Sequence, residues 1–597
     1  MTGPTGGTTS SRRRRIVRSL RRHPVLLGTG LVVVVWAVAC GVLLARAAAD
    51  LRDGRAAARE ARDHLDAEAV AAGTPVAPLR RAANHLDRAA AATGNPLLAP
   101  ARFLPVVGRQ LRSVHALSEA VAEVADAAAE GVATLQGVLD GRDLAGGARI
   151  TQLRVLDDAV ARVAARVGAV DDLGPSKGLV GPLVDARNEV AAELAEAKES
   201  LADAAAGTSA ARRLLEGPRR YLLVAANNAE MRAGSGMWLS AGLLTTEGGE
   251  LSLGDVEPIY EFEVPAGAVT ATGVLSDRWG WLAPETEWRN LMVSPRFAES
   301  AELASRMWAA AGGGEVDGVL AIDPVALRAL IASTGPIQLD DGTVTADDVL
   351  PDLLHDQYEG IQTGDDAETG QRRDRLSRLT GATFDALEAG SWSPATLARE
   401  LGAAVRGRHL LAWSSHPDEQ AGWEAAGMDG ALTSDSLAVS LLNTGGNKLD
   451  WFVRTDVVMT SEPGEGGRTA VRLAVRIDNP TPEGESGYVA GPHPALVPLL
   501  RAGDYRGMLA VNLPGQADDI EVEGVDAVEV RGADGPTRVV GSTVVVRRGS
   551  TVEVTVRFTL PASVGSVLIE PSARVPAARW HYGGGAWQDD RRRVANV

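Results

Sequence analysis

Cysteine is almost absent from this sequence, because Cys40 is the only one among 597 residues. A disulfide within the chain and a zinc site built from cysteines are therefore excluded. Three histidines of the N-terminal third, His64, His85 and His115, have no partners at metal-ligand spacing. The sequence also lacks a dinucleotide fingerprint, an HExxH motif and an EF-hand loop. No metal site is predicted.

Aromatic residues make up only 4% of the chain, and positive charge is in deficit. The formal net charge of −17 argues against a nucleic-acid partner. Hydrophobic residues at 45% and charged residues at 23% are ordinary values for a folded protein. A chain of this length exceeds one hydrophobic core, so about three to five domains are expected.

One long run without charge stands near the N-terminus, at Val25–Ala45. It is long enough to cross a hydrocarbon core of about 30 Å as a helix. Seven arginines precede it, and this excess predicts a cytoplasmic N-terminus: Arg12, Arg13, Arg14, Arg15, Arg18, Arg21 and Arg22. We therefore expect a cytoplasmic basic tail (1–24), a transmembrane helix (25–46) and a single-pass cell-membrane protein whose bulk is extracytoplasmic.

Two alternatives to an uncleaved anchor remain at this point. A cleavable signal peptide has a shorter apolar region, usually of about 7–15 residues. A lipoprotein signal is the second alternative, because Ala37–Gly41 loosely resembles the lipoprotein cleavage motif around Cys40.

Residues 47–216 predict a helical stalk, since Ala, Leu, Glu and Arg dominate and Gly and Pro fall in a few places. Apolar residues recur every three or four positions, as in Leu111, Val114, Leu117, Val121 and Val124. Leu104-Pro105 interrupts this pattern and indicates a short membrane-proximal or inter-helix loop. We expect an antiparallel helical bundle that spaces the next domains and self-associates into a homo-oligomer.

The remaining chain predicts an α+β multidomain protein. Strand-like and helix-like segments alternate over 217–448, which indicates a layered α/β core domain, with Asp323-Pro324 starting one helix. Short alternating strands over 449–575 predict a β-sandwich, and 576–597 is interpreted as a flexible tail.

The stretch Arg220–Leu244 holds the main candidate site. An apolar run ends in Asn227, Asn228, Glu230 and Arg232, and a second apolar run follows. These side chains are either ligand-binding groups on a loop at a strand end or groups that pin the turn and pair with each other. Arg372 and Arg373 lie on a basic helix face that is either solvated or binds an anion.

Other polar or aromatic groups are weaker candidates. Trp279, Trp281 and Trp288 form either a sugar-stacking platform or the anchors of a long loop. Ser414-Ser415-His416 lacks the geometry of a catalytic triad, and Gly445–Lys448 is a turn rather than a phosphate loop.

The Arg220–Leu244 stretch resembles a bacterial domain-of-unknown-function family, number 4012. The similarity continues through VDGVLAIDPVALRALIASTGPIQLDDGTVTADDVL, the Gln371–Arg373 helix, GRHLLAWSSHPDEQAGWEAAGMDG and LLNTGGNKLDWFVRTDV. It extends from about Arg102 to the C-terminus. It implies a membrane-anchored envelope protein, and it implies no established activity.

A more distant resemblance is to the LytR–CpsA–Psr proteins, which transfer glycopolymers from a polyprenyl-pyrophosphate lipid to the cell wall. It places Arg232, the strand Val316–Asp323, the turn Gly335–Ile337 and Arg372 or Arg373 at matching positions. Such a site implies guanidinium groups on a pyrophosphate and a carboxylate on Mg²⁺. Gly234-Ser235-Gly236 stands where that family has the carboxylate, so the sequence does not decide whether the chain is an enzyme or needs a cofactor.

The functional expectation is an envelope protein that binds a lipid-linked saccharide or cell-wall polymer during surface-polysaccharide or cell-wall assembly. The alternative is a non-enzymatic envelope scaffold or sensor that makes protein contacts through the stalk and the β-sandwich.

Overall fold

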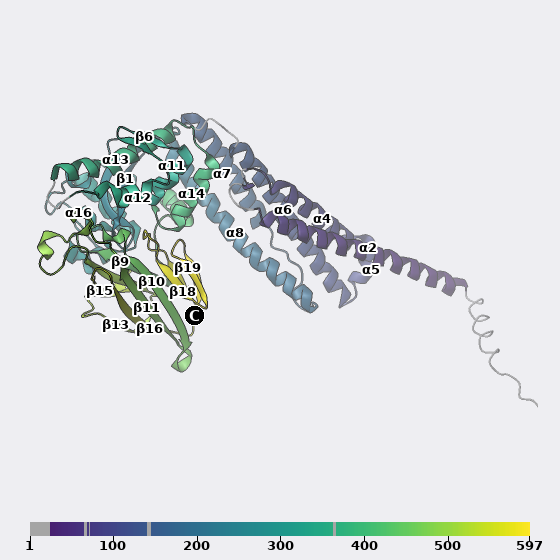
Figure 1. Ribbon diagram of the computed structural model, residues 1–597. Coiled ribbons are helices and arrows are strands. Elements are labelled where there is room, and N and C mark those ends of the chain that lie inside the picture. The colour runs from purple at the N-terminus through teal and green to yellow at the C-terminus, as the bar shows by residue number, and fades with distance from the viewer. Residues whose placement is uncertain (1–23, 65–68, 71, 140–144, 362–365) are drawn as a thin grey trace, which may run out of the picture. The chain divides into compact units, whose positions relative to one another are not determined.

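The computed structural model describes residues 24–64, 69–70, 72–139, 145–361 and 366–597. Within these ranges, the description covers the backbone alone for residues 24–33, 139 and 366–374. The protein is a mixed α/β structure with an apolar N-terminal helix and several sheets (Figure 1). It divides into two compact units, residues 1–136 with 159–201 and residues 137–158 with 202–597. This division assigns two parts of the predicted stalk, 137–158 and 202–216, to the second unit.

Helices build the first unit. They are α2 (Pro24–Arg62), α4 (Val76–Gly94), η1 (Pro96–Leu98), α5 (Ala99–Arg102) and the unit's parts of α6 (Val107–Leu139), α7 (Gly146–Gly168) and α8 (Gly181–Glu216). The buried contacts are made mainly by alanines, such as Ala57, Ala82 and Ala125, which let helices approach closely. Within α2, Val34–Arg62 is long and apolar enough to cross a membrane.

The second unit contains a sheet with strand order β3-β2-β1-β5-β8, which we call the β1 sheet; a sixth strand, β4, pairs with β2. The strands are β1 (Arg219–Met231), β2 (Gly236–Glu247), β3 (Glu250–Leu253), β4 (Glu257–Pro258), β5 (Gly318–Ile322) and β8 (Leu410–Ser414). β1 pairs antiparallel with β2 and parallel with β5, and β2 and β3 form an antiparallel hairpin that turns at Gly248-Gly249.

Both faces of β1 are buried, which explains its nearly continuous apolar sequence. Tyr221, Leu223 and Ala225 face one cluster, and Leu222 and Val224 face the other. Four helices pack on the first face: α11 (Pro324–Thr334), α12 (Val349–Leu354), α13 (Asp366–Glu388) and α14 (Pro394–Arg406). The second face contacts α10 (Phe297–Ala310) and side chains of the C-terminal sheets.

Two six-stranded sheets follow and share one apolar core; we call residues 436–597 the two-sheet region. One sheet has the order β14-β15-β12-β9-β17-β20, and the other has the order β13-β16-β11-β10-β18-β19. The first contains β9 (Ser436–Asn443), β12 (Tyr505–Leu513), β14 (Val530–Asp534), β15 (Thr537–Val546), β17 (Ser566–Glu570) and β20 (Arg593–Asn596). The second contains β10 (Arg454–Pro463), β11 (Thr469–Asn479), β13 (Asp518–Glu523), β16 (Ser550–Leu560), β18 (Arg579–Tyr582) and β19 (Gly585–Gln588).

Two predicted boundaries were wrong. The two-sheet region begins at β9, before the predicted boundary at 449, because β9 pairs with β12 and β17. Residues 576–597 are not a flexible tail: β18 pairs parallel with β10 (Figure 1), and β20 pairs with β17. Trp580 is buried in the core, which fixes this segment by apolar burial.

The buried carboxyl group of Asp589 also ties the C-terminal segment to the fold. Its Oδ2 accepts hydrogen bonds from the backbone N (2.9 Å) and Oγ (2.7 Å) of Ser572. Burial raises the pKa of Asp589 to about 6, against the stabilising bonds from Ser572.

Because the folded pKa of Asp589 lies above the unfolded value of about 3.9, the folded state binds more protons than the unfolded state between these values. We expect this group to lower the free energy of unfolding by about 2–3 kcal/mol as pH rises from 4 to 7, through the folded-state pKa. Urea unfolding of wild type and Asp589→Asn from pH 4 to 7 tests this. The free energy of unfolding of wild type, relative to that of the variant, should fall by this amount over the pH range. A difference between the two proteins that does not change with pH would contradict the prediction.

Candidate functional site

Asn227, Asn228 and Glu230 lie within β1 and not on a loop, and Arg232 is the first residue after the strand. β1 continues to Met231, and the turn to β2 is closed by the Arg232 backbone N, which donates to the Ser235 oxygen (2.8 Å). Gly236 allows this tight approach, since a Cβ there would lie 2.4 Å from the carbonyl carbon of Asn227. The prediction of a loop was wrong for Asn227, Asn228 and Glu230, because their side chains have partners inside the protein and the strand does not have to end before them. Arg232 does lie in the turn that follows the strand.

Asn227 and Asn228 are both buried and donate to neighbouring elements. The Asn227 amide donates to the Tyr358 hydroxyl (2.8 Å) and the Leu353 carbonyl (3.2 Å). The Asn228 amide donates to Asp323 Oδ2 (2.9 Å) and to the carbonyl of Ala573 (2.8 Å). The two asparagines therefore connect β1 to α12 and to the two-sheet region.

Asp323 confirms its predicted role at the start of α11. Its Oδ1 accepts from the backbone N of Val325 (2.9 Å) and Ala326 (3.1 Å), as expected of a helix N-cap. Its Oδ2 also contacts His409 Nδ1 at 2.6 Å. All of this carboxylate's described contacts lie within the protein.

Glu230 pairs with Lys448, whose Nζ lies 2.7 Å from Glu230 Oε1. The exposed fractions of the two side chains are only 13% and 3%. The ammonium also lies 5.0 Å from the centre of the Tyr358 ring and 5.5 Å from that of Tyr488. Burial alone lowers the pKa of Lys448, but the charge of Glu230 raises it above its usual value, so Lys448 is cationic.

Arg232 is buried, and its guanidinium donates mainly to backbone carbonyls. Nε donates to Arg289 O (2.9 Å), and Nη1 donates to Met231 O (3.0 Å) and Asn443 O (3.0 Å). Burial lowers the pKa of Arg232, opposed by the charges of Glu230 and Asp450. Within the described part of the chain it forms no ion pair with a carboxylate, so the expected Glu230–Arg232 pair is not formed.

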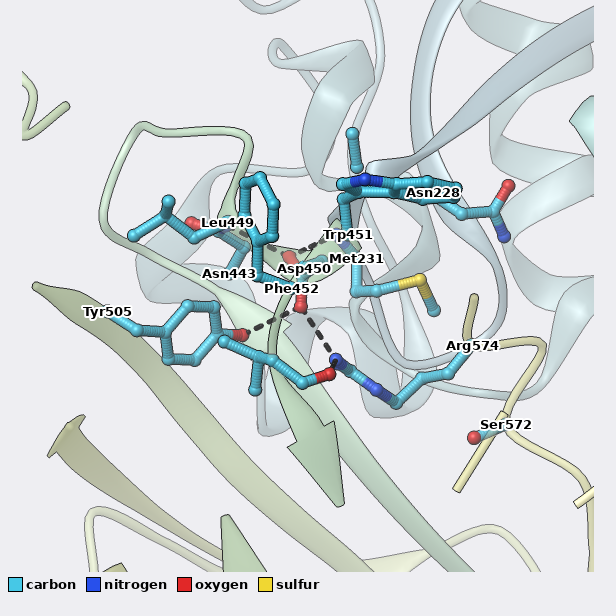
Figure 2. A network of polar contacts seen from close by, with 12 residues as sticks. Asn228, Met231, Asn443, Leu449, Asp450, Trp451, Phe452, Tyr505, Ser572 and Arg574 are labelled. Carbon is cyan, nitrogen blue, oxygen red and sulfur yellow. Dashed lines mark hydrogen bonds and ion pairs between the residues drawn. The ribbon is translucent and has the colours of Figure 1, made fainter. Parts of the chain in front are cut away.

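Asp450 lies at the centre of a second buried network, which sequence reasoning missed (Figure 2). Its Oδ2 accepts from Met231 N (3.0 Å) and Asn443 Nδ2 (2.9 Å). Its Oδ1 accepts from Arg574 Nη1 (2.8 Å) and Tyr505 Oη (3.0 Å). We call Asp450, Asn443, Tyr505 and Arg574 the Asp450 network.

The Asp450 carboxylate and the Arg574 guanidinium neutralise each other within this network. Burial alone lowers the pKa of Arg574, yet Asp450 raises it above its usual value. Burial and the nearby Asp450 carboxylate raise the pKa of Tyr505. Asp450 and Arg574 therefore form an ion pair, and three further neutral donors complete the hydrogen bonding of the carboxylate, as a buried pair requires. The network joins the end of β1 to β12 and to the segment after β17.

Comparison with known proteins gives a family match for a segment that includes β1–β5 of the β1 sheet. Residues 216–358 match the family described as protein of unknown function, DUF4012. No curated protein and no solved structure matches the chain. The predicted family is therefore confirmed over 216–358, a shorter range than the expected one from Arg102 to the C-terminus. These comparisons do not confirm the resemblance to LytR–CpsA–Psr proteins.

The DUF4012 segment ends before the basic helix α13. Arg372 and Arg373 lie in α13, but their side chains are outside the described residues. The next arginine, Arg375, pairs with Asp352 (2.8 Å), and Arg378 contacts Asp341 (3.3 Å). The two described arginines of this face thus interact with carboxylates of the protein.

The three tryptophans of the loop after β4 do not act together. Trp279 and Trp288 are buried in the core beside β1, and Trp288 Nε1 donates to Phe262 O (2.9 Å). Trp281 is 60% exposed. Two of the three are therefore loop anchors, which was one of the two sequence interpretations.

A different aromatic group lies at the edge of the DUF4012 segment. His355, Trp451, Phe452 and Tyr488 are all partly exposed, and we call them the aromatic rim. The His355 ring stacks on Trp451 at 6.4 Å between ring centres and meets Phe452 edge-on at 5.4 Å. Tyr488 lies 5.5 Å from Tyr358. Three of these residues lie in segments after 448 that the sequence left without a site, so their joint position is a tertiary feature.

Carboxylates border the aromatic rim. His355 Nδ1 lies 2.8 Å from Asp356 Oδ1, and its Nε2 lies 3.1 Å from Glu485 Oε2. Burial alone lowers the pKa of His355, but these two carboxylates raise it above its usual value. His355, Asp356 and Glu359 have ligand atoms within 4.8 Å of one another. Both nitrogens of the His355 ring already contact carboxylates, so this group does not fit a cation in this arrangement. A role for Mg²⁺ is implied only by the resemblance to LytR–CpsA–Psr proteins, and it stays untested.

Proposed function

We propose that the chain is a single-pass membrane protein whose extracytoplasmic part binds a lipid-linked saccharide or cell-wall polymer during surface-polysaccharide or cell-wall assembly. In this proposal α2 is the anchor, with its N-terminus cytoplasmic. The helices up to α8 form a stalk, the β1 sheet with its helices forms a layered α/β domain, and the two-sheet region is a β-sandwich. The aromatic rim is the binding surface.

The aromatic rim is the single observation that carries this proposal. In a chain with 4% aromatic residues, the partly exposed rings of Trp451 and Phe452 both contact His355, which lies beside Asp356 and Glu485. Aromatic faces pack well on the apolar faces of sugar rings, and carboxylates accept hydrogen bonds from sugar hydroxyls. Ligand sites typically combine apolar walls with a few polar groups in this way.

The buried residues of β1 support the rim instead of contacting the ligand. Trp451 and Phe452 directly follow Asp450 in the chain (Figure 2). Asp450 is fixed by four hydrogen bonds, and Lys448 by Glu230. A rigid support lowers the entropy cost of ordering a binding surface. We thus propose binding without catalysis, with Asn227, Asn228, Glu230 and Arg232 as positioning residues.

Trp451→Ala is expected to weaken binding about tenfold, because a stacked ring contributes roughly 0.5–1.5 kcal/mol beyond its buried area. The measurement is titration of the full chain in detergent micelles with a polyprenyl-pyrophosphate-linked oligosaccharide and with the free oligosaccharide. Trp281→Ala is the matched control, since Trp281 is exposed and outside the rim. Its affinity should equal that of wild type.

Three outcomes of these binding experiments would overturn part of the proposal. Equal loss in both tryptophan variants, or no binding by wild type, would overturn the saccharide proposal in favour of the scaffold alternative. Release of polyprenyl pyrophosphate on addition of Mg²⁺ and a wall-polymer acceptor would overturn the claim that binding occurs without catalysis.

A further inference from the structure

An apolar segment of the first unit is exposed to solvent at the turn between α4 and α6. Residues 96–107, which we call the apolar tip, contain η1 and α5. Its exposed large side chains are Leu97, Phe103, Leu104, Val106 and Val107. Phe103 is 87% exposed, an unusual state for a phenylalanine. A cluster of exposed apolar side chains of this kind marks a contact surface.

The apolar tip is fixed against α2, the helix that can cross a membrane. Trp36 Nε1 donates to the Leu97 carbonyl at 2.7 Å, and Cys40 Sγ lies 3.6 Å from the same oxygen. Cys40 also packs with Leu98 and Leu111 in one apolar cluster. The neighbouring α2 residues Val34, Val35, Val38 and Val42 remain exposed. The apolar surface of α2 thus continues onto the tip.

The position of these contacts along α2 sets the depth of the tip. Trp36 and Cys40 both lie inside the uncharged run Val25–Ala45. With a rise of 1.5 Å per residue, Cys40 lies about 7–8 Å and Trp36 about 13–14 Å inside the end at Ala45. If that run spans the hydrocarbon core of about 30 Å, the tip lies within the half farther from the arginine cluster.

The backbone of the apolar tip is suited to an apolar medium, because short helical turns use many of its polar groups. Leu98 N donates to Asn95 O (2.9 Å), Leu104 N to Ala101 O (3.2 Å) and Gly108 N to Leu104 O (2.8 Å). The Asn95 side chain accepts from Leu97 N (3.0 Å). Helical hydrogen bonding of this kind is what permits a backbone to enter lipid.

The distribution of charged residues around the apolar tip also favours contact with lipid. No acidic residue occurs between Asp87 and Glu119, although the chain carries 77 acidic residues. Arg102, Arg109 and Arg112 lie in this stretch, as does Arg88, which pairs with Asp50. The long arginine side chain allows its charge to reach the headgroup level while its stem lies along apolar surface. The stretch therefore matches an anionic headgroup layer around an inserted apolar tip.

We propose that the apolar tip inserts into the leaflet farther from the arginine cluster, beside α2, as a second membrane contact of this protein. This inference rests on the proposed anchoring by α2 and is independent of saccharide binding. Two contacts with one leaflet, from α2 and the tip, fix the direction in which α4 and α6 leave the membrane. A single spanning helix would leave that direction free.

Site-directed fluorescence in the full chain tests the insertion. Cys40→Ser gives a cysteine-free background that keeps a donor toward Leu97 O, and Phe103→Cys then carries a nitrobenzoxadiazole label. The protein is placed in vesicles of phosphatidylcholine and phosphatidylglycerol. Quenching by iodide in water is compared with quenching by a doxyl group on the lipid chain. At position 103 the lipid quencher should reduce emission at least twofold, and iodide should have little effect.

Two further labels make the result decisive. Leu499→Cys is the aqueous control, since Leu499 is 73% exposed in the second unit, and iodide should quench it. Val35→Cys reports α2 itself and should be quenched from lipid. Position 103 behaving like 499 while 35 is lipid-quenched would overturn the proposal and leave the anchor intact. An aqueous result at 35 would overturn the anchoring and the insertion together. Protection of 103 from both quenchers would overturn it in favour of a contact between copies of the chain.

Discussion

Replacing Asp450 with alanine should lower the free energy of unfolding by about 3–5 kcal/mol, the usual cost of removing one partner of a buried ion pair. The guanidinium of Arg574, which is as buried as Asp450, would lose its counter-charge. Asn443, Tyr505 and the backbone N of Met231 would each lose an acceptor. Urea unfolding of the full chain in detergent micelles, followed by tryptophan fluorescence, measures this effect.

Asp518→Ala is the matched control for Asp450→Ala. Asp518 lies 3.5 Å from Arg468, and the exposed fractions of the two side chains are 65% and 38%. Exposed pairs of this kind contribute roughly 0–1 kcal/mol. Equal urea midpoints for the two variants would show that the Asp450 network does not stabilise the join between β1 and the two-sheet region.

The ion pair between Glu230 and Lys448 is expected to show the second large effect. Lys448→Met should cost about 3 kcal/mol, because it leaves the Glu230 carboxylate without a counter-charge in a mostly buried place. Adding Glu230→Gln to that variant should recover at least about 1 kcal/mol, since residues in direct contact couple by roughly 0.5–3 kcal/mol. Urea unfolding of wild type, both single variants and the double variant completes the cycle.

This cycle also separates the two interpretations of Glu230. A positioning residue gives a coupling energy with Lys448, and its substitution changes stability. A ligand-binding residue would give additive effects on stability, and Glu230→Gln alone would weaken binding of the lipid-linked oligosaccharide. Additive effects would contradict the positioning role.

Much of the local structure followed from the sequence. The apolar run of β1, the hairpin at Gly248-Gly249 and the cap at Asp323 depend on residues near one another in the chain. Side-chain period, turn residues and capping groups encode these features directly. The helical N-terminal third was predictable for the same reason, although alanines bury more of its contacts than the predicted valine and leucine stripe.

The polar residues of β1 could not be assigned in this way. A run of Asn, Glu and Arg after an apolar segment indicates a loop when no partners are known. The partners are Tyr358, Asp323 and Lys448, together with the carbonyls of Arg289 and Asn443 for Arg232, and they lie about 57 to 218 positions away along the chain. When these partners are in place, the polar side chains at the end of β1 can be buried, and the strand can continue through them.

The prediction of a flexible tail at 576–597 was wrong for a related reason. Its strands are only four residues long, and a short strand with polar neighbours resembles a tail. The parallel pairing of β18 with β10 and the burial of Trp580 arise only when both sheets are assembled.

The sequence by itself determined the apolar N-terminal helix, the mixture of helices and strands, and the DUF4012 relationship over 216–358. These depend on composition, period and motif, which are properties of contiguous residues. Only the tertiary structure decided that Asn227, Asn228 and Arg232 are buried, that Glu230 pairs with Lys448, that His355 contacts Trp451 and Phe452, and that the apolar tip lies against α2. These features join residues far apart in the chain, and packing selects such partners by shape and charge rather than by sequence distance.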